Sequence, residues 1–345
     1  MSLAAPASVI NTARRVDPTG TTGLRARFVS EMNGRFGDLD RAIRETIIDN
    51  DAFGTRRNVE TLRTRPKLVA APPRAFAFRT AAERVDGFME WLRQQEDAGI
   101  LERVYRGPLS RQLRWTDLYI DSAYRKGIRD AITKMKRVGV SPPIVGIGDP
   151  IRAAFLQPVH AERVAVLYSR TFEDLKTVIE AANGQARRVM ADAMARELAT
   201  AIAEGRAPAA VARKLARDVI GRVDKVGLYR ARMIARTEII RAHHVATITE
   251  YERAGMEGVE VDAEILTAGF DVCPICIDAA NNGPYTLAQA RGLIPLHPHC
   301  RCTTKPLIRV IRGEPQRSRR QLAVLEARAD AWLDSLLDRF ERRAA

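Results

Sequence analysis

The residues with the clearest chemistry are four cysteines that all lie in one short stretch of the chain. Cys273 and Cys276 form a Cys-Pro-Ile-Cys turn, and Cys300 and Cys302 follow it after a loop. In a protein of a reducing compartment, clustering of this kind indicates a metal site before disulfides. A Cys-x-x-Cys turn places two thiolates on one side, at the separation that a single tetrahedral zinc ion needs. The stretch therefore predicts a structural zinc site.

More residues could bind the zinc ion than its four coordination positions allow. His297 and Cys300 repeat the two-residue gap of the first cysteine pair. Cys302 replacing His297 is the main alternative, and His299 competes for the same places. Reduced, metal-free cysteines and a disulfide are the other interpretations. A site closed by four protein ligands has no open position for catalysis, so we predict no catalytic residue. The preferred zinc ligands are Cys273, Cys276, His297 and Cys300.

The loop over residues 270–305 that carries these ligands is mostly polar. Asn281-Asn282-Gly283-Pro284 predicts a turn, and a short helix is expected from Thr286 to Arg291. Since few of its residues are apolar, we expect the loop to bury too little surface to order itself. Metal binding would supply the ordering free energy, on the order of 10 kcal/mol.

Amphipathic helices precede this loop. Residues 1–20 are rich in Ala, Pro, Thr and Gly, and we expect them to be mobile or to depend on a partner. Apolar residues at steps of three and four predict a helix from Leu24 to Ile47, and the Pro-rich residues 51–79 predict a linker. Thr80 and Glu83 form a capping box, which starts a helix that ends near Gly99. Further helices are predicted over residues 115–138, 159–203, 208–219 and 225–254, the last ending at Gly255.

The hydrophobic period changes after Gly258. Residues 259–265 alternate between apolar and acidic types, as in a half-buried strand, and residues 307–311 are a second strand candidate. The predicted fold is therefore mainly α, with helical N-terminal and central regions and a small zinc-stabilised α+β C-terminal region. The expected divisions are a flexible N-terminus 1–20, a helical domain 21–150, a domain 151–312 and a C-terminal helix 313–345.

The charge balance is strongly basic. The 345 residues include 56 Lys and Arg against 42 Asp and Glu, a net charge of +14. Such an excess favours a polyanion such as DNA, or an acidic protein surface, although Arg-rich proteins of GC-rich genomes are often basic without such a partner. Apolar runs fall well short of the roughly 18 residues that cross a bilayer, and no secretory signal is visible. We expect no membrane partner and synthesis in a reducing cytoplasm.

Two segments resemble a known family. They are ARTEIIRAHH at 235–244 and CPICIDAANNGPYTLAQARGLIPLHPHCRC at 273–302. Together they are similar to the phage head morphogenesis (Mu F-like minor head protein) family. Its members share an Ala-Arg-Thr-Glu helix, a Cys-x-x-Cys turn or an acidic substitute, and a closing Pro-x-His-Pro-x-Cys-Arg-Cys. His299 departs from the family pattern, because many members have a small polar residue there. The resemblance covers about residues 160–310, and the closing motif is matched by Pro295, His297, Pro298, Cys300, Arg301 and Cys302.

The resemblance implies a minor capsid protein of a tailed bacteriophage. Such a protein belongs to the virion, in the phage head near the portal, and is assembled in the host cytoplasm. The implied partners are the portal protein and capsid subunits, with non-specific contact to packaged DNA, and the implied role is procapsid assembly and DNA packaging or delivery. No catalytic activity is implied. Arg236, Thr237 and Glu238 are interpreted as a polar anchor between their helix and the zinc loop, with Glu238 reaching Arg241.

Two other functions use the same residues. A zinc-stabilised DNA-binding protein would explain the charge, but no base-reading helix lies beside the ligands. A metal-dependent nuclease could draw on His243, His244 and His297. Against it, the best four ligands close the site, and adjacent histidines face different sides of a helix. His160 is expected to be structural.

Overall fold

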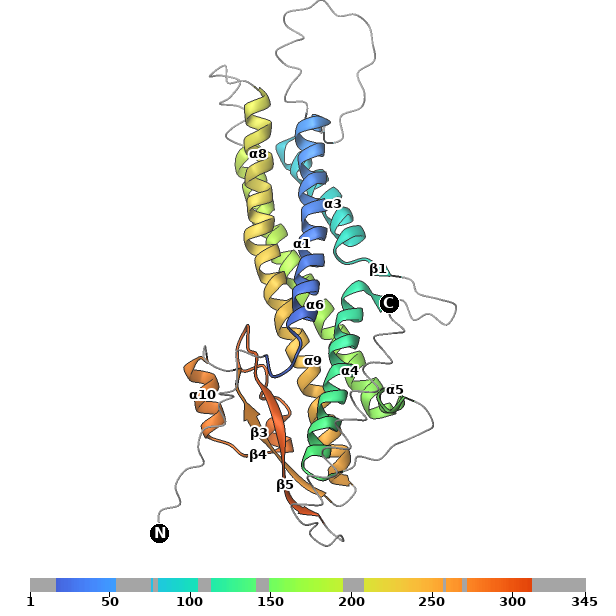
Figure 1. Cartoon of the computed structure of the whole chain (residues 1–345). Coiled ribbons are helices and arrows are strands. Elements are labelled where there is room, and N and C mark those ends of the chain that lie inside the picture. Colours follow the sequence, from blue (N-terminus) through green and yellow to red (C-terminus); the bar gives the residue numbers. More distant parts are fainter. Residues whose placement is uncertain are drawn as a thin grey trace, which may run out of the picture. The chain divides into compact units, whose positions relative to one another are not determined.

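A computed structural model of the chain describes residues 17–53, 76, 80–104, 113–140, 149–194, 208–256, 259–268 and 272–311. It confirms a mainly helical fold with a small antiparallel sheet near the C-terminal end (Figure 1). Most of the predicted flexible N-terminus and linker, the end of the helix predicted to reach residue 203, and the predicted C-terminal helix lie outside the described residues.

The helices follow the apolar periodicity closely. The Thr80 hydroxyl accepts a hydrogen bond from the Glu83 amide at 3.2 Å, and the Glu83 carboxylate accepts one from the Thr80 amide at 3.1 Å, which confirms the capping box. The helical elements are α1 Thr22–Arg44, η1 Glu45–Asp49, α3 Ala81–Gly99, α4 Trp115–Arg137, α5 Pro150–Phe155, α6 Pro158–Asp192, α8 Pro208–Arg222, η3 Val223–Leu228, α9 Tyr229–Met256, α10 Pro274–Asn281 and α11 Leu287–Ala290. The strands are β1 Arg103–Val104, β2 Leu113–Arg114, β3 Val259–Leu266, β4 Tyr285–Thr286 and β5 Thr303–Ile311.

The break predicted between residues 219 and 225 is not found. The chain is helical without interruption from α8 through η3, a π-helix, into α9. Gly227 lies inside η3, where an added Cβ would be 3.0 Å from Cε1 of Phe36, so its missing side chain lets the helix pack closely. Gly255, predicted to end the last long helix, lies within α9. At Gly227, close packing therefore outweighs the usual tendency of glycine to end a helix; nothing lies within 4 Å of an added Cβ at Gly255.

The residues form two compact units. Unit 1 comprises Met1–Ala26, Leu118–Ser169 and Arg236–Ala345, and unit 2 comprises Arg27–Asp117 and Arg170–Ala235. Both units draw on segments from each side of residue 150. None of the helices in the described segments is long and apolar enough to cross a membrane.

The sheet of unit 1 has the order β4-β3-β5, and both pairings are antiparallel. Strand β3 runs along β5 from Leu266 opposite Thr303 to Val259 opposite Ile311. β5 therefore begins four residues earlier than the predicted 307–311. Its start is held by the carbonyl oxygen of Thr304, which accepts hydrogen bonds from Lys134 Nζ at 2.8 Å and from the Tyr251 hydroxyl at 3.2 Å.

The core of unit 1 is built around α9, which is buried on nearly every side. Ile248 and Tyr251 of α9 pack with Met135 of α4 and Ala263 of β3. Helix α4 approaches α9 at Gly127, where an added Cβ would lie 2.8 Å from the Cβ of Ala246 and would overlap the His243 carbonyl oxygen. Gly127 therefore sets the spacing of these two helices.

A buried polar network also lies in this core. The side chain of His160 is fully buried, with Nε2 2.8 Å from Glu250 Oε1 and Nδ1 3.0 Å from the Tyr124 hydroxyl. Arg253 donates to the same Glu250 carboxylate at 2.8 and 3.0 Å. His160 thus joins three elements, α4, α6 and α9, as expected for a structural histidine.

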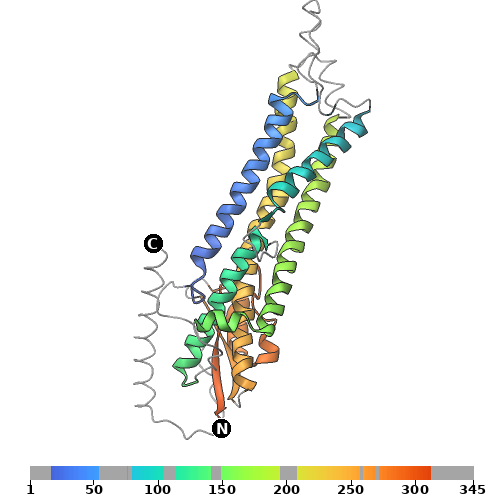
Figure 2. The ribbon, with the colours of Figure 1, turned by 90° about the vertical axis from the view of Figure 1, so that its right-hand side faces the viewer.

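Unit 2 packs the apolar face of α1 against its other helices. The predicted stripe is buried at Phe28, Met32, Phe36, Leu39 and Ile43. The ring of Phe28 meets the edge of Trp115, with ring centroids 5.4 Å apart. Within the same unit, α3 runs beside the C-terminal half of α6 (Figure 2).

Candidate metal centre

The first half of the candidate site is the start of helix α10. Cys273 occupies the N-cap position, Pro274 follows in the first turn, and Cys276 lies within that turn. The backbone amide of Cys276 donates to the Cys273 carbonyl at 3.0 Å, which closes the Cys-x-x-Cys turn. Unpaired amide groups at a helix N-terminus carry partial positive charge, so this position favours thiolates.

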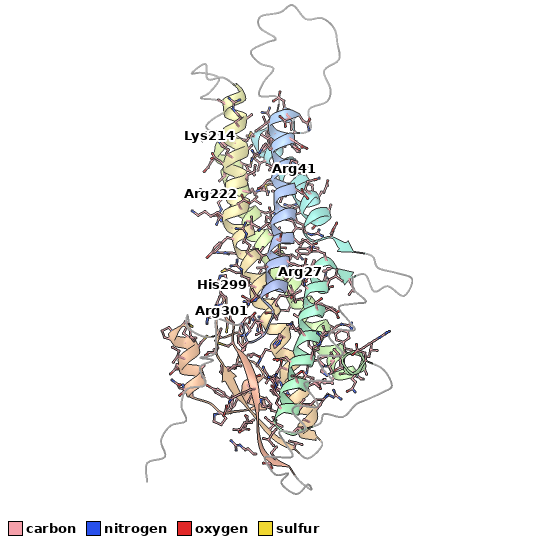
Figure 3. The ribbon with its side chains drawn as sticks, in the orientation of Figure 1. Arg27, Arg41, Lys214, Arg222, His299 and Arg301 are labelled. Atoms are coloured by element: carbon pink, nitrogen blue, oxygen red, sulfur yellow. The ribbon has the colours of Figure 1, made fainter. Side chains whose placement is uncertain are left out.

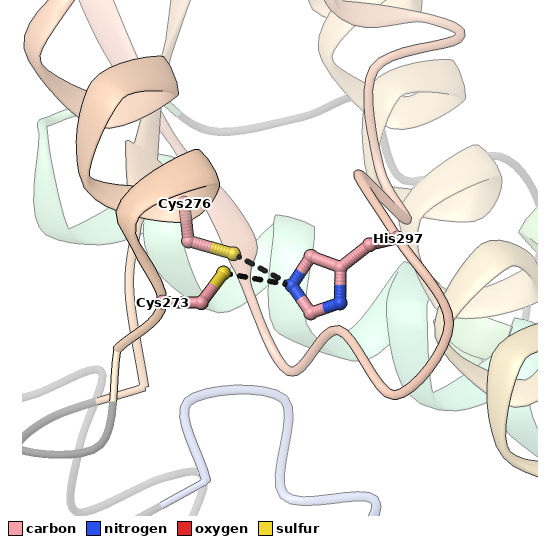
Figure 4. A group of neighbouring side chains, drawn as sticks. All are labelled: Cys273, Cys276 and His297. Atoms are coloured by element: carbon pink, nitrogen blue, oxygen red, sulfur yellow. Dashed lines mark hydrogen bonds between the residues drawn. The ribbon is translucent and has the colours of Figure 1, made fainter.

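The second half of the candidate site is a turn from His297 to Cys300, near the other end of the loop. The amide of Cys300 donates to the carbonyl of His297 at 3.1 Å, and His299 adopts a positive φ of 66° within this turn. His297 Nε2 lies 3.1 Å from the sulfur atoms of both Cys273 and Cys276 (Figure 4). The structure therefore brings the two cysteines of the predicted turn together with His297.

Five side chains contribute to two overlapping ligand groups. Cys273, Cys276 and His297 form one group and Cys276, Cys300 and Cys302 the other, and within each group the ligand atoms lie within 4.8 Å of one another. Cys276 belongs to both groups. The predicted ligand set spans both groups, and the alternative ligand Cys302 lies in the second. The cluster is largely buried and could hold a metal ion.

The histidine is oriented for ligation. Its Nδ1 lies 2.6 Å from the carbonyl oxygen of Pro298, which can only accept a hydrogen bond, so Nδ1 carries the proton. Nε2 then keeps its lone pair and faces the two sulfur atoms. A second hydrogen bond of this kind commonly fixes the tautomer and direction of a metal-ligating histidine.

The sulfur atoms form a hydrogen-bonded set among themselves. Hydrogen bonds from the thiols of Cys276 and Cys302 lower the pKa of Cys300 to about 2. The pKa of Cys276 is raised, and the main cause is the hydrogen bond of its thiol with Cys300. These hydrogen bonds favour a thiolate at Cys300 and a protonated Cys276. A metal ion would displace the remaining thiol protons when it binds.

The other candidate histidines lie outside both ligand groups. His299 is exposed and is 3.5 Å from Arg236 Nη1. His243 and His244 are fully buried, and burial is the main cause that lowers the pKa of each to about 4. Nε2 of His244 lies 2.8 Å from the carbonyl oxygen of Ala290 and donates to it.

The loop also takes part in an apolar cluster, and it buries more apolar surface than its polar composition predicted. Ile265 and Ile294 pack with the buried cysteines and with Ile240 of α9, while Leu293 and Leu296 lie at its edge. The metal would therefore add to an existing core. Its removal should loosen the loop more than it unfolds the whole unit.

Helix α9 holds the loop at several points. Arg241 Nε donates to both oxygens of Glu238, at 3.0 and 3.1 Å, which confirms the predicted pair. On the loop itself, α9 contacts come from Ile240, from the hydrogen bond of His244 to Ala290 and from Glu252, which pairs with Arg291 at 2.6 Å. Of the predicted anchor residues, Arg236 lies 3.5 Å from His299 of the loop. The role of His244 was missed because a single histidine on a helix has no periodic signal. The one hint was its place in the ARTEIIRAHH segment.

Comparisons of the chain with protein-family models, with curated proteins and with solved structures found no match. The residues of the chain and their geometry are therefore the basis for assigning its function.

Proposed function

We propose that this chain is a minor head protein of a tailed bacteriophage that acts in procapsid assembly near the portal and in DNA packaging or delivery. The observation that supports this most is that the two family-like segments belong to one unit. Ile240, within ARTEIIRAHH, packs on the cluster that contains Cys276 and Cys300. His244 bonds the loop between the two cysteine pairs. These contacts therefore join the two segments on which the resemblance depends.

Zinc is the proposed ion, in a structural role. The ligand groups consist of cysteine sulfur and histidine nitrogen, the donor types that tetrahedral zinc prefers. With Zn–S near 2.3 Å and Zn–N near 2.0–2.1 Å, ligand atoms on one ion lie about 3.5–3.8 Å apart. The Cys273 and Cys276 sulfur atoms, each 3.1 Å from His297 Nε2, are already close to that spacing.

The assembly role predicts where the protein is found. Mass spectrometry of procapsids and mature heads, purified from the phage that carries this chain, should detect it in low copy number beside the portal protein. A Cys276→Ser variant should be incorporated several-fold less, because its loop is less ordered, whereas His299→Ala, which lies outside both ligand groups, should be incorporated normally. Absence of the wild-type chain from both particle types would refute the proposal.

Contact with DNA is supported by a cationic hollow in unit 2. Arg217, Arg222 and Lys225 line a cavity of about 370 Å³ on α8 and η3, together with Gly221, Val189 and one acid, Asp218, which pairs with Lys214 at 3.3 Å. These three cations form no ion pair within the described ranges. Figure 3 shows Arg222 on α8, and Lys225 belongs to the π-helix, a feature that is often found at functional sites. Unpaired cations around a hollow suit a phosphate group.

Replacing the three cations with glutamine should weaken binding to duplex DNA and make it less sensitive to salt. If all three contact phosphates, the slope of log K against log salt should become shallower by about 2.7. Fluorescence anisotropy with two DNA duplexes of unrelated sequence, at several salt concentrations, would measure both the affinity and its dependence on salt. Equal slopes for the variant and the wild type would contradict this assignment.

The matched control removes the same charge elsewhere. Arg27 of α1, Arg129 of α4 and Arg152 of α5 are exposed and lie outside the hollow, so their replacement with glutamine should change the slope much less. A marked sequence preference in the wild type would instead favour the alternative function, a zinc-stabilised DNA-binding regulator.

A metal-dependent nuclease is less well supported. The two ligand groups contain no carboxylate, and buried His243 and His244 belong to neither of them. A nuclease would need a general base and an open metal position near its substrate. DNA cleavage by the pure protein, lost on chelation and restored by zinc or magnesium, would support that alternative.

A further inference from the structure

A second cavity, separate from the metal centre, lies in unit 2 between α3 and α6. Its volume is about 370 Å³. Met89, Leu101 and Ile179 supply apolar lining, and charged side chains of both helices complete it. The volume is within the range of small organic ligands, and the mixture of apolar walls with a few polar groups is typical of a binding site.

The most buried polar groups of this cavity are Glu96 and Asn183, which are only 2% and 9% exposed. Asn183 Nδ2 donates to Glu96 Oε2 at 2.6 Å. Asn183 Oδ1 is buried and has no hydrogen-bond partner. Since an unpaired buried carbonyl costs free energy, the pair presents acceptors that are not fully used.

The ion pairs around the cavity do not include its two acids from α3. Among the lining cations, Arg93 pairs with Glu90 at 2.8 Å, Lys176 lies 3.9 Å from Glu180, and Arg187 pairs with Asp86. Glu96 and Asp97, in contrast, form no ion pair within the segments that the structure describes. The cavity therefore has unused hydrogen-bond acceptors beside two acids of α3 that form no ion pair in the described part of the chain.

We propose that this cavity binds an alkylguanidinium or alkylammonium group, whose N–H groups donate to the Glu96 carboxylate and to Asn183 Oδ1 and whose carbon chain lies against Met89, Leu101 and Ile179. A buried carboxylate is stabilised by a cation that also donates hydrogen bonds. The apolar lining favours an organic cation over a bare metal ion, which would need several oxygen ligands. The group can come from an arginine or lysine side chain of a partner protein, or from a free polyamine.

The state of Glu96 without a ligand makes the binding dependent on pH. Burial is the main cause that raises the pKa of Glu96 to about 8. The cation must therefore compete with the proton that the Glu96 carboxyl group holds. The charged groups around Glu96 are Arg93 and Asp97 of α3 and Lys176, Glu180 and Arg187 of α6.

The direction in which stability and ligand affinity change with pH follows from the raised pKa of Glu96. The stabilising contribution of protonated Glu96 is complete below the unfolded value near 4.5 and is lost as pH rises through about 8. Ligand affinity changes in the opposite direction, because only ionised Glu96 binds the cation. Affinity should therefore rise roughly 30-fold between pH 6.5 and pH 9, in proportion to the ionised fraction.

The test is calorimetric titration of the full chain with three probes at both pH values. The probes are butylguanidinium, spermidine and a capped Gly-Arg-Gly peptide, with magnesium chloride as the metal control. Butylguanidinium should bind and should bind tighter at pH 9. Preference for the peptide over spermidine would identify a protein side chain as the source of the group, and the reverse preference a free polyamine.

Two variants test the residues. Glu96→Gln should weaken butylguanidinium binding at least about tenfold at pH 9 and remove its pH dependence, since a charge-assisted hydrogen bond is lost. Glu180→Gln removes the same charge from an exposed lining position and should change affinity by less than about twofold. The amide of glutamine resembles the protonated acid, so the variant should fold. No binding of any organic cation at pH 9, tighter binding of magnesium, or equal affinities of Glu96→Gln and the wild type would overturn the proposal.

Discussion

Replacing Cys276 with serine is expected to abolish stoichiometric zinc binding and to lower the free energy of unfolding of unit 1 by several kcal/mol. Among the described residues, Cys276 is the side chain shared by both ligand groups, and without its sulfur each group is left with only two ligand atoms within 4.8 Å of each other. Zinc binding in small structural sites contributes on the order of 10 kcal/mol, and the apolar cluster of the loop will retain part of the order. Elemental analysis of tag-free protein and chemical denaturation measure the two effects.

Control variants separate the ligands from their neighbours. His299→Ala should keep full zinc content, while His297→Ala and Cys302→Ser show which of the two completes the set. With the wild type, a strong chelator should make residues 272–305 sensitive to protease before the helices are cut. Wild-type protein that contains no zinc, or a Cys276→Ser variant that keeps it, would disprove the proposed centre.

The second large effect is expected from Gly127→Ala in α4. The new methyl group would overlap the His243 carbonyl oxygen and lie 2.8 Å from the Cβ of Ala246, and both belong to the buried helix α9. Helix backbones cannot yield as a flexible side chain can, so we expect a loss of roughly 3 kcal/mol or more in the free energy of unfolding. Thermal and urea denaturation would measure it.

Gly37→Ala in α1 is the matched control for this substitution. An added Cβ at Gly37 has nothing within 4 Å, and the residue lies in the interior of a helix. Alanine should therefore stabilise the protein by up to about 1 kcal/mol, through the lower entropy of the unfolded chain. If both variants had the same stability, α4 and α9 would not be in the close contact described here.

Elements with one buried face could be predicted from the sequence. The stripe of α1 and the capping box at Thr80 were correct because local spacing alone determines them. Helix α9 does not have a single apolar buried face, since polar residues such as Glu238, His243 and Glu250 are also buried on it. Glu238 and Glu250 pair with Arg241 and Arg253 of the same helix, but the approach of His160 to Glu250 and of Asp130 to His243 comes from other helices and is contained in no local pattern.

For the metal centre, the sequence identified the residues but not the geometry. Cysteine clustering and the spacing of His297 to Cys300 selected all five side chains of the two groups, while His299, a further candidate, lies outside both. Their division into two groups that share Cys276 depends on how α10 meets the turn at His297, which spacing does not specify. The cavity at Glu96 had a signal that was overlooked, because this acid follows Val85, Phe88 and Leu92 on the buried face of α3.

The outer strand of the sheet has a consequence for crowded surroundings. Among the strands that the structure describes, β5 lies at the edge of its sheet, and an unprotected edge can recruit a strand from a neighbouring molecule. Pro306, opposite Ala263, has no amide hydrogen to offer, and Lys305 and Arg309 place charged side chains along the strand, in ion pairs with Glu264 and Asp262 of β3. Copies held at high local concentration should therefore stay separate along this edge, and fibre-like stacking through β5 is disfavoured.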